Sequence, residues 1–505
     1  NVVNLGTMTI NTDVKITSGG HFSSLIENGF YNGNGKTNNP KLTINGGTFS
    51  GGLNTVKNDD RGVLEIKGGT FTNVSQAAVL NWNNATIDGG TFQANVDAQA
   101  VILNGQIDDA MDVGKLTING GSFTAAKSSA VIKEMTGSGA KAIGTVEIND
   151  GTFATGNGEI ISLVAANADK ATINIVKGRF TTTNEAAKTA LSQYVDPSAE
   201  FDSSTGTVSA IPADQAVVSV GAKNYKSLAD AVAAVQDNDT ITLLKDVTLT
   251  ADLSIENGKT FTIDLNHKTL SGADIFIKGS AFVTAKNGKI CGDVWLKTTN
   301  EDKPYNSFTL ADDAEIETNG YGIVVTQVNK GAENYGSTVN IQGSVTGKES
   351  TLWVLGNITT DLKTAKNPVT VNVGSTAKLI NNDKTNTALQ MAGACDVTVE
   401  DGAQITGGTA IEVRAGKLTV KGGTITGTGT ATEVQPNGNG TSTKGAGIGI
   451  AQHTTKQPIE VTISGGKISG HTAFFESNPH KNEGDAQQKI ELNIAGGEFT
   501  ATNGG

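Results

Sequence analysis

A short motif that recurs along the first part of the chain limits the possible folds more than any other feature. It alternates apolar and polar residues, turns through two glycines, and resumes with a hydroxyl residue and a phenylalanine, as in residues 42–49. Similar copies place phenylalanines 21 to 31 residues apart at Phe49, Phe71, Phe92, Phe123, Phe153 and Phe180, and an earlier copy ends at Phe22. One such repeat is too short to bury its own apolar face, so the copies must stack.

Each copy has the two-residue period of a pleated strand, with Leu42 and Ile44 facing inward and Thr43 facing outward. The two glycines allow a sharp corner, after which Phe49 faces inward on a second strand. A third strand per repeat is visible in runs such as residues 100–103. We therefore predict an all-β fold, a right-handed parallel β-helix solenoid in which the phenylalanines from Phe49 onward form one interior column.

The repeat is interrupted between about residues 184 and 240. Residues 184–194 carry an amphipathic pattern after Asn184, a suitable N-cap, and residues 227–236 carry another after Ser227. Short amphipathic helices beside a solenoid are typical end caps. The sequence predicts two consecutive β-helical domains with short capping helices, an N-terminal one over residues 1–211 and a C-terminal one over 212–505.

The glycine corner returns in the second half, where isoleucine often replaces phenylalanine. The last copies end at Ile425, Ile468 and Phe499. Two long polar segments interrupt them, residues 427–445 and 476–488, and both are predicted to be loops. Loops of a solenoid commonly carry its variable or binding surface.

Composition excludes several classes of partner and cofactor. The net charge is −12 and no run of Lys and Arg occurs, so a nucleic-acid partner is not expected. No stretch of about 18 apolar residues exists, so membrane insertion is not expected. Cys291, Cys395 and the five histidines show no metal-ligand spacing, so we predict no metal site and no cofactor. The chain starts without an initiator Met or a signal peptide, and we expect it to be part of a longer soluble protein.

The segments 225–232 and 239–249, together with the Gly-Gly-Thr-Phe copies, resemble large surface proteins of Gram-positive, gut-type bacteria. These look like right-handed β-helices of the pectin-lyase-like superfamily, and the resemblance covers nearly the whole chain. It implies a secreted, adhesin-like protein of the cell surface or cell wall, attached to the wall through segments not present here. No Leu-Pro-x-Thr-Gly sorting signal occurs in this sequence.

The same superfamily contains polysaccharide lyases and glycoside hydrolases, so an enzyme is the alternative reading. Cleavage needs facing carboxylates at a defined separation, or a metal-assisted site with a nearby base. The candidate acid groups are Asp59 and Asp60 with Arg61, Asp108 and Asp109 with Asp112, and Asp312 and Asp313 with Glu315. Adjacent acids on a strand point to opposite faces, and acids in turns are usually solvated. We predict no catalytic residues.

The preferred function is a non-enzymatic extracellular scaffold that binds glycans or host and cell-surface matrix. Trp82, Trp295 and Trp353 are the only tryptophans, and an exposed indole can stack on a sugar ring. Packing in the core or at a corner is the structural explanation for the same residues. The three tryptophans, together with Asp108 and Asp109, are the candidate ligand-binding residues.

Overall fold

The computed structural model describes residues 1–502 apart from 32, 34, 96, 107–111, 137–142, 164–171, 298–304, 327–335, 359–360, 366–367, 438–439, 479 and 484–487. Strands make up 53% of the chain and helices 4%, so the predicted all-β class is confirmed. The chain groups into two compact units, Asn1–Ala213 and Asp214–Gly505, called unit 1 and unit 2 below. Within the described residues, no helix is both long and apolar enough to cross a membrane.

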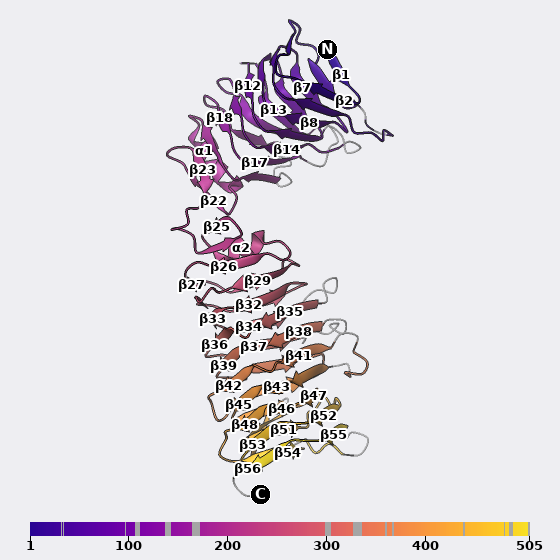
Figure 1. Ribbon diagram of the computed structural model, residues 1–505, viewed down its shortest axis with the longest axis vertical. Helices are drawn as coiled ribbons and strands as arrows, with labels where there is room; N and C mark the ends of the chain where they lie inside the picture. Colours follow the sequence, from indigo (N-terminus) through magenta and orange to yellow (C-terminus); the bar gives the residue numbers. More distant parts are fainter. Residues whose placement is uncertain are drawn as a thin grey trace. The chain divides into compact units, whose positions relative to one another are not determined.

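Unit 1 contains three sheets, and the chain passes through them in rotation, so that each strand pairs in parallel with the strand three places later (Figure 1). Sheet 1 holds β1 (Val2–Asn4), β4 (Ile26–Asn28), β7 (Asn54–Asn58), β10 (Ala77–Asn81), β13 (Ala100–Gln106), β16 (Ala130–Thr136) and β19 (Ile161–Leu163). Sheet 2 holds β2 (Thr7–Ile10), β5 (Lys41–Ile44), β8 (Val63–Ile66), β11 (Asn84–Ile87), β14 (Lys115–Ile118), β17 (Thr145–Ile148) and β20 (Thr172–Ile175). Sheet 3 holds β3 (Lys15–Thr17), β6 (Thr48–Ser50), β9 (Thr70–Val74), β12 (Thr91–Ala94), β15 (Ser122–Thr124), β18 (Thr152–Ala154) and β21 (Gly178–Thr181), and ends with the antiparallel strands β23 (Thr207–Ala210) and β22 (Ala199–Asp202).

Unit 2 repeats this rotation through three further sheets. Sheet 4 begins with the antiparallel β25 (Lys223–Tyr225) and β24 (Val218–Val220) and continues with β26 (Thr240–Leu243), β29 (Thr260–Asp264), β32 (Phe282–Lys286), β35 (Tyr305–Leu310), β38 (Gly336–Ile341), β41 (Val369–Val373), β44 (Cys395–Val399), β47 (Gly416–Val420), β52 (Ile459–Ile463) and β55 (Ile490–Ile494). Sheet 5 holds β27 (Val247–Thr248), β30 (Thr269–Ser271), β33 (Gly288–Cys291), β36 (Ala314–Glu317), β39 (Ser344–Gly347), β42 (Lys378–Asn381), β45 (Gln404–Gly407), β48 (Thr424–Gly427), β53 (Lys467–Gly470) and β56 (Glu498–Ala501). Sheet 6 holds β28 (Leu253–Ile255), β31 (Ile275–Lys278), β34 (Val294–Lys297), β37 (Ile323–Thr326), β40 (Leu352–Leu355), β43 (Thr387–Ala392), β46 (Thr409–Val413), β51 (Ala446–Ala451) and β54 (Thr472–Ser477).

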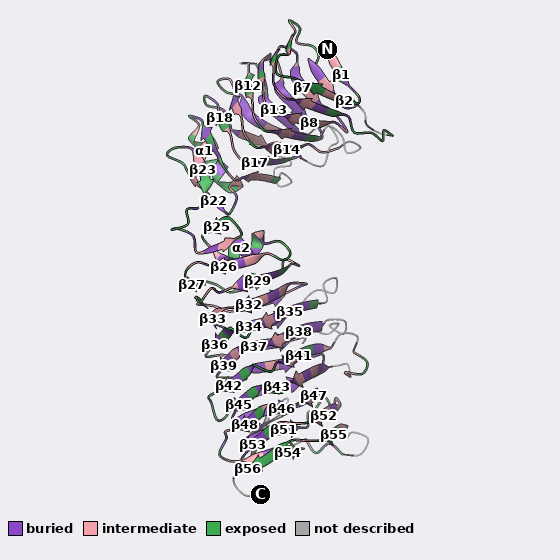
Figure 2. Cartoon of the chain, viewed as in Figure 1, coloured by how far each residue is buried: buried purple, intermediate pink, exposed green. Residues whose placement is uncertain are grey.

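Burial alternates along most strands of both units, as a two-residue period requires (Figure 2). In β5, Leu42 and Ile44 are fully buried, while Thr43 between them is partly exposed. The inward residues of each unit form one apolar cluster that is continuous from turn to turn. These long parallel sheets, entered in rotation, are compatible with a β-helix-like fold.

The predicted phenylalanine column is confirmed in unit 1. Phe49, Phe71, Phe92, Phe123, Phe153 and Phe180 are each at most 1% exposed, and neighbouring ring centroids lie 4.6–5.0 Å apart with planes within 13° of parallel. The corner before Phe92 depends on Gly90, whose φ of 119° disfavours any other residue. The earlier copy is an exception, because Phe22 is 99% exposed and Ile16 pairs with Phe49 instead.

A column of buried amides, which the sequence analysis missed, runs beside the apolar core of unit 1. Each side-chain amide donates to the side-chain oxygen of the next residue, at distances of 2.7–2.9 Å, in the order Asn4, Asn28, Asn58, Asn81, Asn104 and Glu134. The amides also donate to corner carbonyls, as Asn58 does to Gly62. The column therefore satisfies polar backbone groups that the corners would otherwise bury unpaired.

Both predicted helices exist and begin at the predicted caps. Helix α1 (Glu185–Ala190) starts after Asn184, which accepts from the Ala187 amide, and a 3₁₀ helix over Leu191–Tyr194 follows it. Helix α2 (Leu228–Ala234) starts after Ser227, which accepts from the Asp230 amide. The apolar residues of the second segment, Leu228, Ala231, Val232 and Val235, are all buried. In the first segment Leu191 is buried and Ala190 is exposed.

The segment 427–445 differs from its prediction as a loop. It contains an antiparallel hairpin of β49 (Glu433–Asn437) and β50 (Gly440–Lys444), inserted between sheets 5 and 6. The high glycine content suggested a loop because glycine is depleted in strands, whereas the two strands of this hairpin pair with each other inside the segment.

Candidate functional site

Four aromatic side chains from neighbouring turns line one stretch of the outer face of sheet 6. The register places Phe276 of β31 beside Trp295 of β34, and Val324 of β37 beside Trp353 of β40. Tyr321, from the corner before β37, lies between the two tryptophans. We call Phe276, Trp295, Tyr321 and Trp353 the aromatic row. Sequence analysis had singled out the two tryptophans without placing them together.

The rings of the aromatic row contact one another in sequence. Phe276 and Trp295 stack at 5.9 Å between centroids, Trp295 meets Tyr321 edge to face at 6.0 Å, and Tyr321 stacks on Trp353 at 5.4 Å. All four side chains are partly exposed. Trp353 is followed in the row by Gln390 and not by another ring.

Two lysines flank the start of the aromatic row. The Lys297 Nζ lies 4.6 Å from the ring centroid of Phe276 and 4.9 Å from that of Trp295, and the Lys278 Nζ lies 5.7 Å from that of Phe276. The two lysines are direct neighbours on adjacent strands. Cation–π contacts of this kind hold charged groups against the rings, where a polar ligand can meet both.

Asp293 fixes Tyr321 at its corner. Its carboxylate accepts the Tyr321 amide at 3.1 Å, the Thr318 hydroxyl at 2.8 Å and the Gly322 amide at 3.3 Å. Burial, with Glu349 and Asp293 nearby, raises the pKa of Tyr321. The phenol therefore stays protonated and can donate a hydrogen bond at neutral pH.

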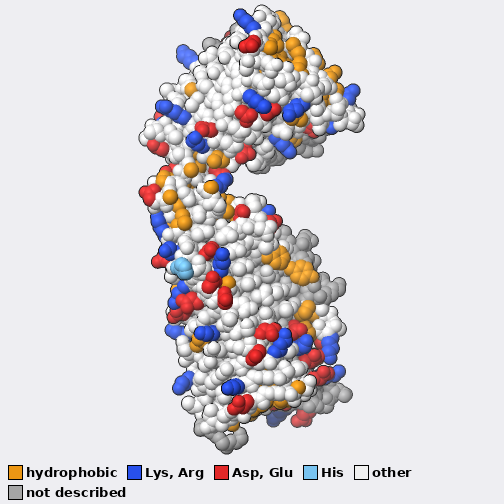
Figure 3. Space-filling view, viewed as in Figure 1, with side chains coloured by type: hydrophobic (Ala, Val, Ile, Leu, Met, Phe, Trp, Pro, Cys, Tyr) orange, Lys and Arg blue, Asp and Glu red, His pale blue; other side chains and the backbone are white. Residues whose placement is uncertain are grey.

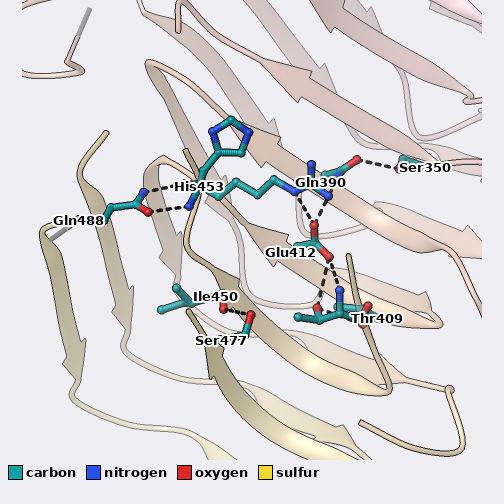
Figure 4. A network of polar contacts seen from close by, with 10 residues as sticks. Ser350, Gln390, Thr409, Glu412, Ile450, His453, Ser477 and Gln488 are labelled. Carbon is teal, nitrogen blue, oxygen red and sulfur yellow. Dashed lines mark hydrogen bonds and ion pairs between the residues drawn. The ribbon is translucent and has the colours of Figure 1, made fainter. Parts of the chain in front are cut away.

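Beyond Trp353 the outer face becomes a polar network (Figure 4). Gln390 donates to Glu412 at 3.1 Å, Arg414 Nε donates to the same oxygen at 2.7 Å, and the Thr443 amide of β50 donates to the other oxygen at 2.8 Å. Glu412 is fully buried, so these donors balance a buried charge. The hairpin thus covers the outer face of sheet 6 beyond Trp353, whereas the aromatic row itself stays partly exposed.

His453 lies at the edge of the same network. Its amide donates to Gln488, whose side chain donates to the Arg414 carbonyl at 2.9 Å. Burial, with Arg414 and His480 nearby, lowers the pKa of His453 to about 4. The imidazole is therefore neutral at pH 7, and its surroundings disfavour a proton-transfer role there.

Trp82 lies elsewhere, in unit 1, and is 4% exposed. It packs in a small apolar cluster with residues that include Leu80 and Leu103. The other two candidates of this unit, Asp108 and Asp109, lie outside the described residues. Of the candidate ligand-binding residues that the structure describes, Trp295 and Trp353 are thus brought into one surface and Trp82 is not.

One pair of acids from the sequence analysis does come together in unit 1. The Asp112 amide donates to Asp60 at 2.9 Å, the Arg61 amide donates to Asp112 at 3.1 Å, and the Gly33 amide donates to Asp60 at 2.7 Å. Burial raises the pKa of Asp59 to about 6, against a lowering effect of Lys57 at 2.5 Å. Burial and then Asp60 raise the pKa of Asp112. The backbone amides hold these carboxylates as turn-forming groups.

Within the described part of the chain, no group of three or more His, Cys, Asp or Glu side chains is arranged to hold a metal ion. Burial raises the pKa of the Cys395 thiol, which disfavours a reactive thiolate. No protein-family model matches the chain, and neither a curated protein nor a solved structure is significantly similar to it. Function has to be inferred from the residues themselves.

Proposed function

We propose that this protein is a non-enzymatic, adhesin-like scaffold of the bacterial cell exterior that binds glycans or cell-surface matrix along the aromatic row. The observation that carries the proposal is the alignment of Phe276, Trp295, Tyr321 and Trp353 beside two lysines on an outer face. Aromatic rings combined with polar tips are the usual means of recognising sugars, which have apolar faces and hydroxyl edges. The Tyr321 hydroxyl and the ammonium groups of Lys278 and Lys297 would orient a bound sugar by donating hydrogen bonds to it.

The proposed architecture is a right-handed parallel β-helix solenoid in each unit. Its support is the strict rotation of the chain through three parallel sheets, together with the right-handedness that parallel crossovers almost always have. In the proposed scheme, α1 and α2 are capping helices and the two units are separate β-helical domains. A solenoid suits an adhesin because stacking turns extend a surface without a deep cavity.

Binding by the full chain to a glycan and matrix-protein array is expected to require the aromatic row. Trp353→Ala should weaken binding about tenfold, the loss typical of an aromatic side chain that contacts a ligand directly. Phe282→Ala is the matched control, because Phe282 is also a partly exposed aromatic but lies on sheet 4. Circular dichroism checks that both variants fold. Binding by Trp353→Ala equal to wild type, or no bound glycan or matrix protein at all, would refute this function.

A carbohydrate-active enzyme is the second candidate, because Asp60 and Asp112 lie together beside Asp59 with its raised pKa. Asp59 and Asp60 are only 2–3% exposed and are engaged by backbone amides or by Lys57, so a substrate would have to displace those contacts. The turn-forming role therefore explains these acids better than catalysis does.

We expect no turnover of pectin, polygalacturonate or mucin glycans, with or without calcium. The measurement is release of reducing or unsaturated sugar ends by the full chain. Product above background that disappears in the Asp60→Asn, Asp112→Asn double variant, but persists in Asp13→Asn, would favour the enzyme. Asp13 is an exposed aspartate away from this pair.

A further inference from the structure

A groove of about 610 Å³ runs along the corner between sheets 4 and 5 of unit 2. Five successive turns line it, through residues 267–269, 288–289, 312–315 and 343–344, and through Thr376 and Lys378. Figure 3 shows acidic and basic side chains gathered around a histidine on the visible face of this unit. The groove is separate from the aromatic row, which lies on sheet 6.

Backbone packing explains why this corner is hollow. A Cβ at Gly343 would lie 2.1 Å from the Ala314 carbonyl oxygen, so the fourth turn rests directly on the third and can carry no side chain there. At the rim, Asn266 and His267 have φ values of 48° and 59°, which is an unusual pair for residues other than glycine. The side-chain amide of Asn266 stabilises this conformation by donating a hydrogen bond to the Leu243 carbonyl at 3.0 Å.

Some charged side chains of the groove already have a partner within the protein, and others do not. Lys289 pairs with Glu315 at 3.4 Å and with Glu317, and Asp313 accepts the Asn287 amide at 2.8 Å. Lys268, Lys378 and Asp312 form no ion pair with any other described residue. Two cations and one anion thus remain available to a ligand.

These available charges alternate along the groove. Lys268 is on the first turn, Asp312 on the third and Lys378 on the fifth. Alternate turns are two strand spacings, or about 10 Å, apart. A purely anionic ligand would meet the repulsion of the central acids, and a purely cationic one that of the flanking lysines. A ligand with both charges on neighbouring units avoids both penalties.

We propose that this groove binds a zwitterionic saccharide, one that carries an amino group and an acidic group. The amino group pairs with Asp312, and the acidic group pairs with Lys378 or Lys268. Ser344 is a hydroxyl partner between them. Exposed ion pairs are individually weak, so recognition depends on meeting both signs together. This site is independent of the glycan binding proposed for the aromatic row.

Equilibrium binding to three matched disaccharides tests the proposal. The parent probe carries one free amino group and one carboxylate, the second is its N-acetyl form, and the third is its methyl ester. The full chain should bind the parent at least about threefold more tightly than either derivative, as expected for one exposed ion pair. A series with a phosphate monoester in place of the carboxylate shows which acidic group fits better.

Two variants test which groove residues cause the preference for the parent probe over its N-acetyl form and over its methyl ester. Asp312→Asn should abolish the preference over the N-acetyl form, and the Lys268→Met, Lys378→Met double variant should abolish the preference over the ester. Lys67→Met, at an exposed lysine of unit 1, should leave both preferences unchanged. The proposal is overturned if no parent probe binds, if the three forms bind equally, or if the groove variants keep both preferences. Loss of binding in Trp353→Ala would instead assign the saccharide to the aromatic row.

Discussion

Phe92→Ala is expected to lower the unfolding free energy of unit 1 by about 3–5 kcal/mol, the range for removing a large aromatic from a packed core. Phe92 is fully buried, and its ring stacks on Phe71 at 4.6 Å and on Phe123 at 4.8 Å. Its removal therefore opens a cavity and also breaks two ring contacts within the column.

Thr91→Ala is the matched control, because Thr91 is the exposed neighbour on the same strand and its loss should cost less than about 1 kcal/mol. Denaturant titration gives the free energies, and hydrogen exchange over residues 84–94 assigns the change to this turn, since repeat proteins need not unfold in one step. Equal losses from the two variants would show that the inward and outward assignment of this strand is wrong.

Unit 1 is expected to lose stability as the pH rises from about 5 to 8, and Glu134 is the main cause, because the pKa of Asp59 is raised only to about 6. Glu134 is fully buried at the end of the amide column, where burial raises its pKa from 4.5 to about 7 against the lowering effect of hydrogen bonds from Asn104 and the Gly144 backbone. The next turn places Leu163 at the equivalent position, so the column continues into an apolar neighbour.

The unfolding free energy falls with rising pH because the folded state keeps the Glu134 proton to a higher pH than the unfolded state does. Below pH 4.5, Glu134 is protonated in both states and contributes no pH dependence. Between pH 4.5 and 7 the unfolded chain releases the proton while the folded chain keeps it, so the unfolding free energy falls. The total loss is about 3 kcal/mol above pH 7, at about 1.4 kcal/mol per pH unit.

Glu134→Gln should remove this part of the pH dependence, because the glutamine stays neutral and its amide oxygen can still accept from Asn104. Urea titrations at pH 5 and pH 8 provide the comparison. Glu147→Gln, at an exposed glutamate of β17, should behave as wild type. An unchanged decline in Glu134→Gln would exclude Glu134 as its source.

Much of the repeat architecture could be predicted because its signals are local. The alternation in residues 42–44, the glycine corner and the column from Phe49 to Phe180 each depend on a few adjacent residues and their backbone preferences. The copy at Phe22 shows the limit of this reasoning. Its glycines and phenylalanine match the motif, yet Ile16 occupies the column position and Phe22 is exposed.

The candidate sites were only partly predictable. Trp295 and Trp353 were singled out by residue type, but Phe276 and Tyr321 were not, because 19 residues separate Phe276 from Trp295 and 58 separate Trp295 from Trp353. The amide column left a signal that could have been found, since an asparagine ends four successive strands of sheet 1, at Asn4, Asn28, Asn58 and Asn81.

The sequence by itself determined the all-β class, the parallel stacking of turns and the identity of the phenylalanine column, because alternation and corner glycines act over a few residues. Only the tertiary structure decided which outward side chains became neighbours, as in the aromatic row and the groove between Lys268 and Lys378. The turns have unequal lengths, and cross-strand neighbours are set by the long-range register of the pairing strands. That register depends on the whole stack, so no single repeat contains it.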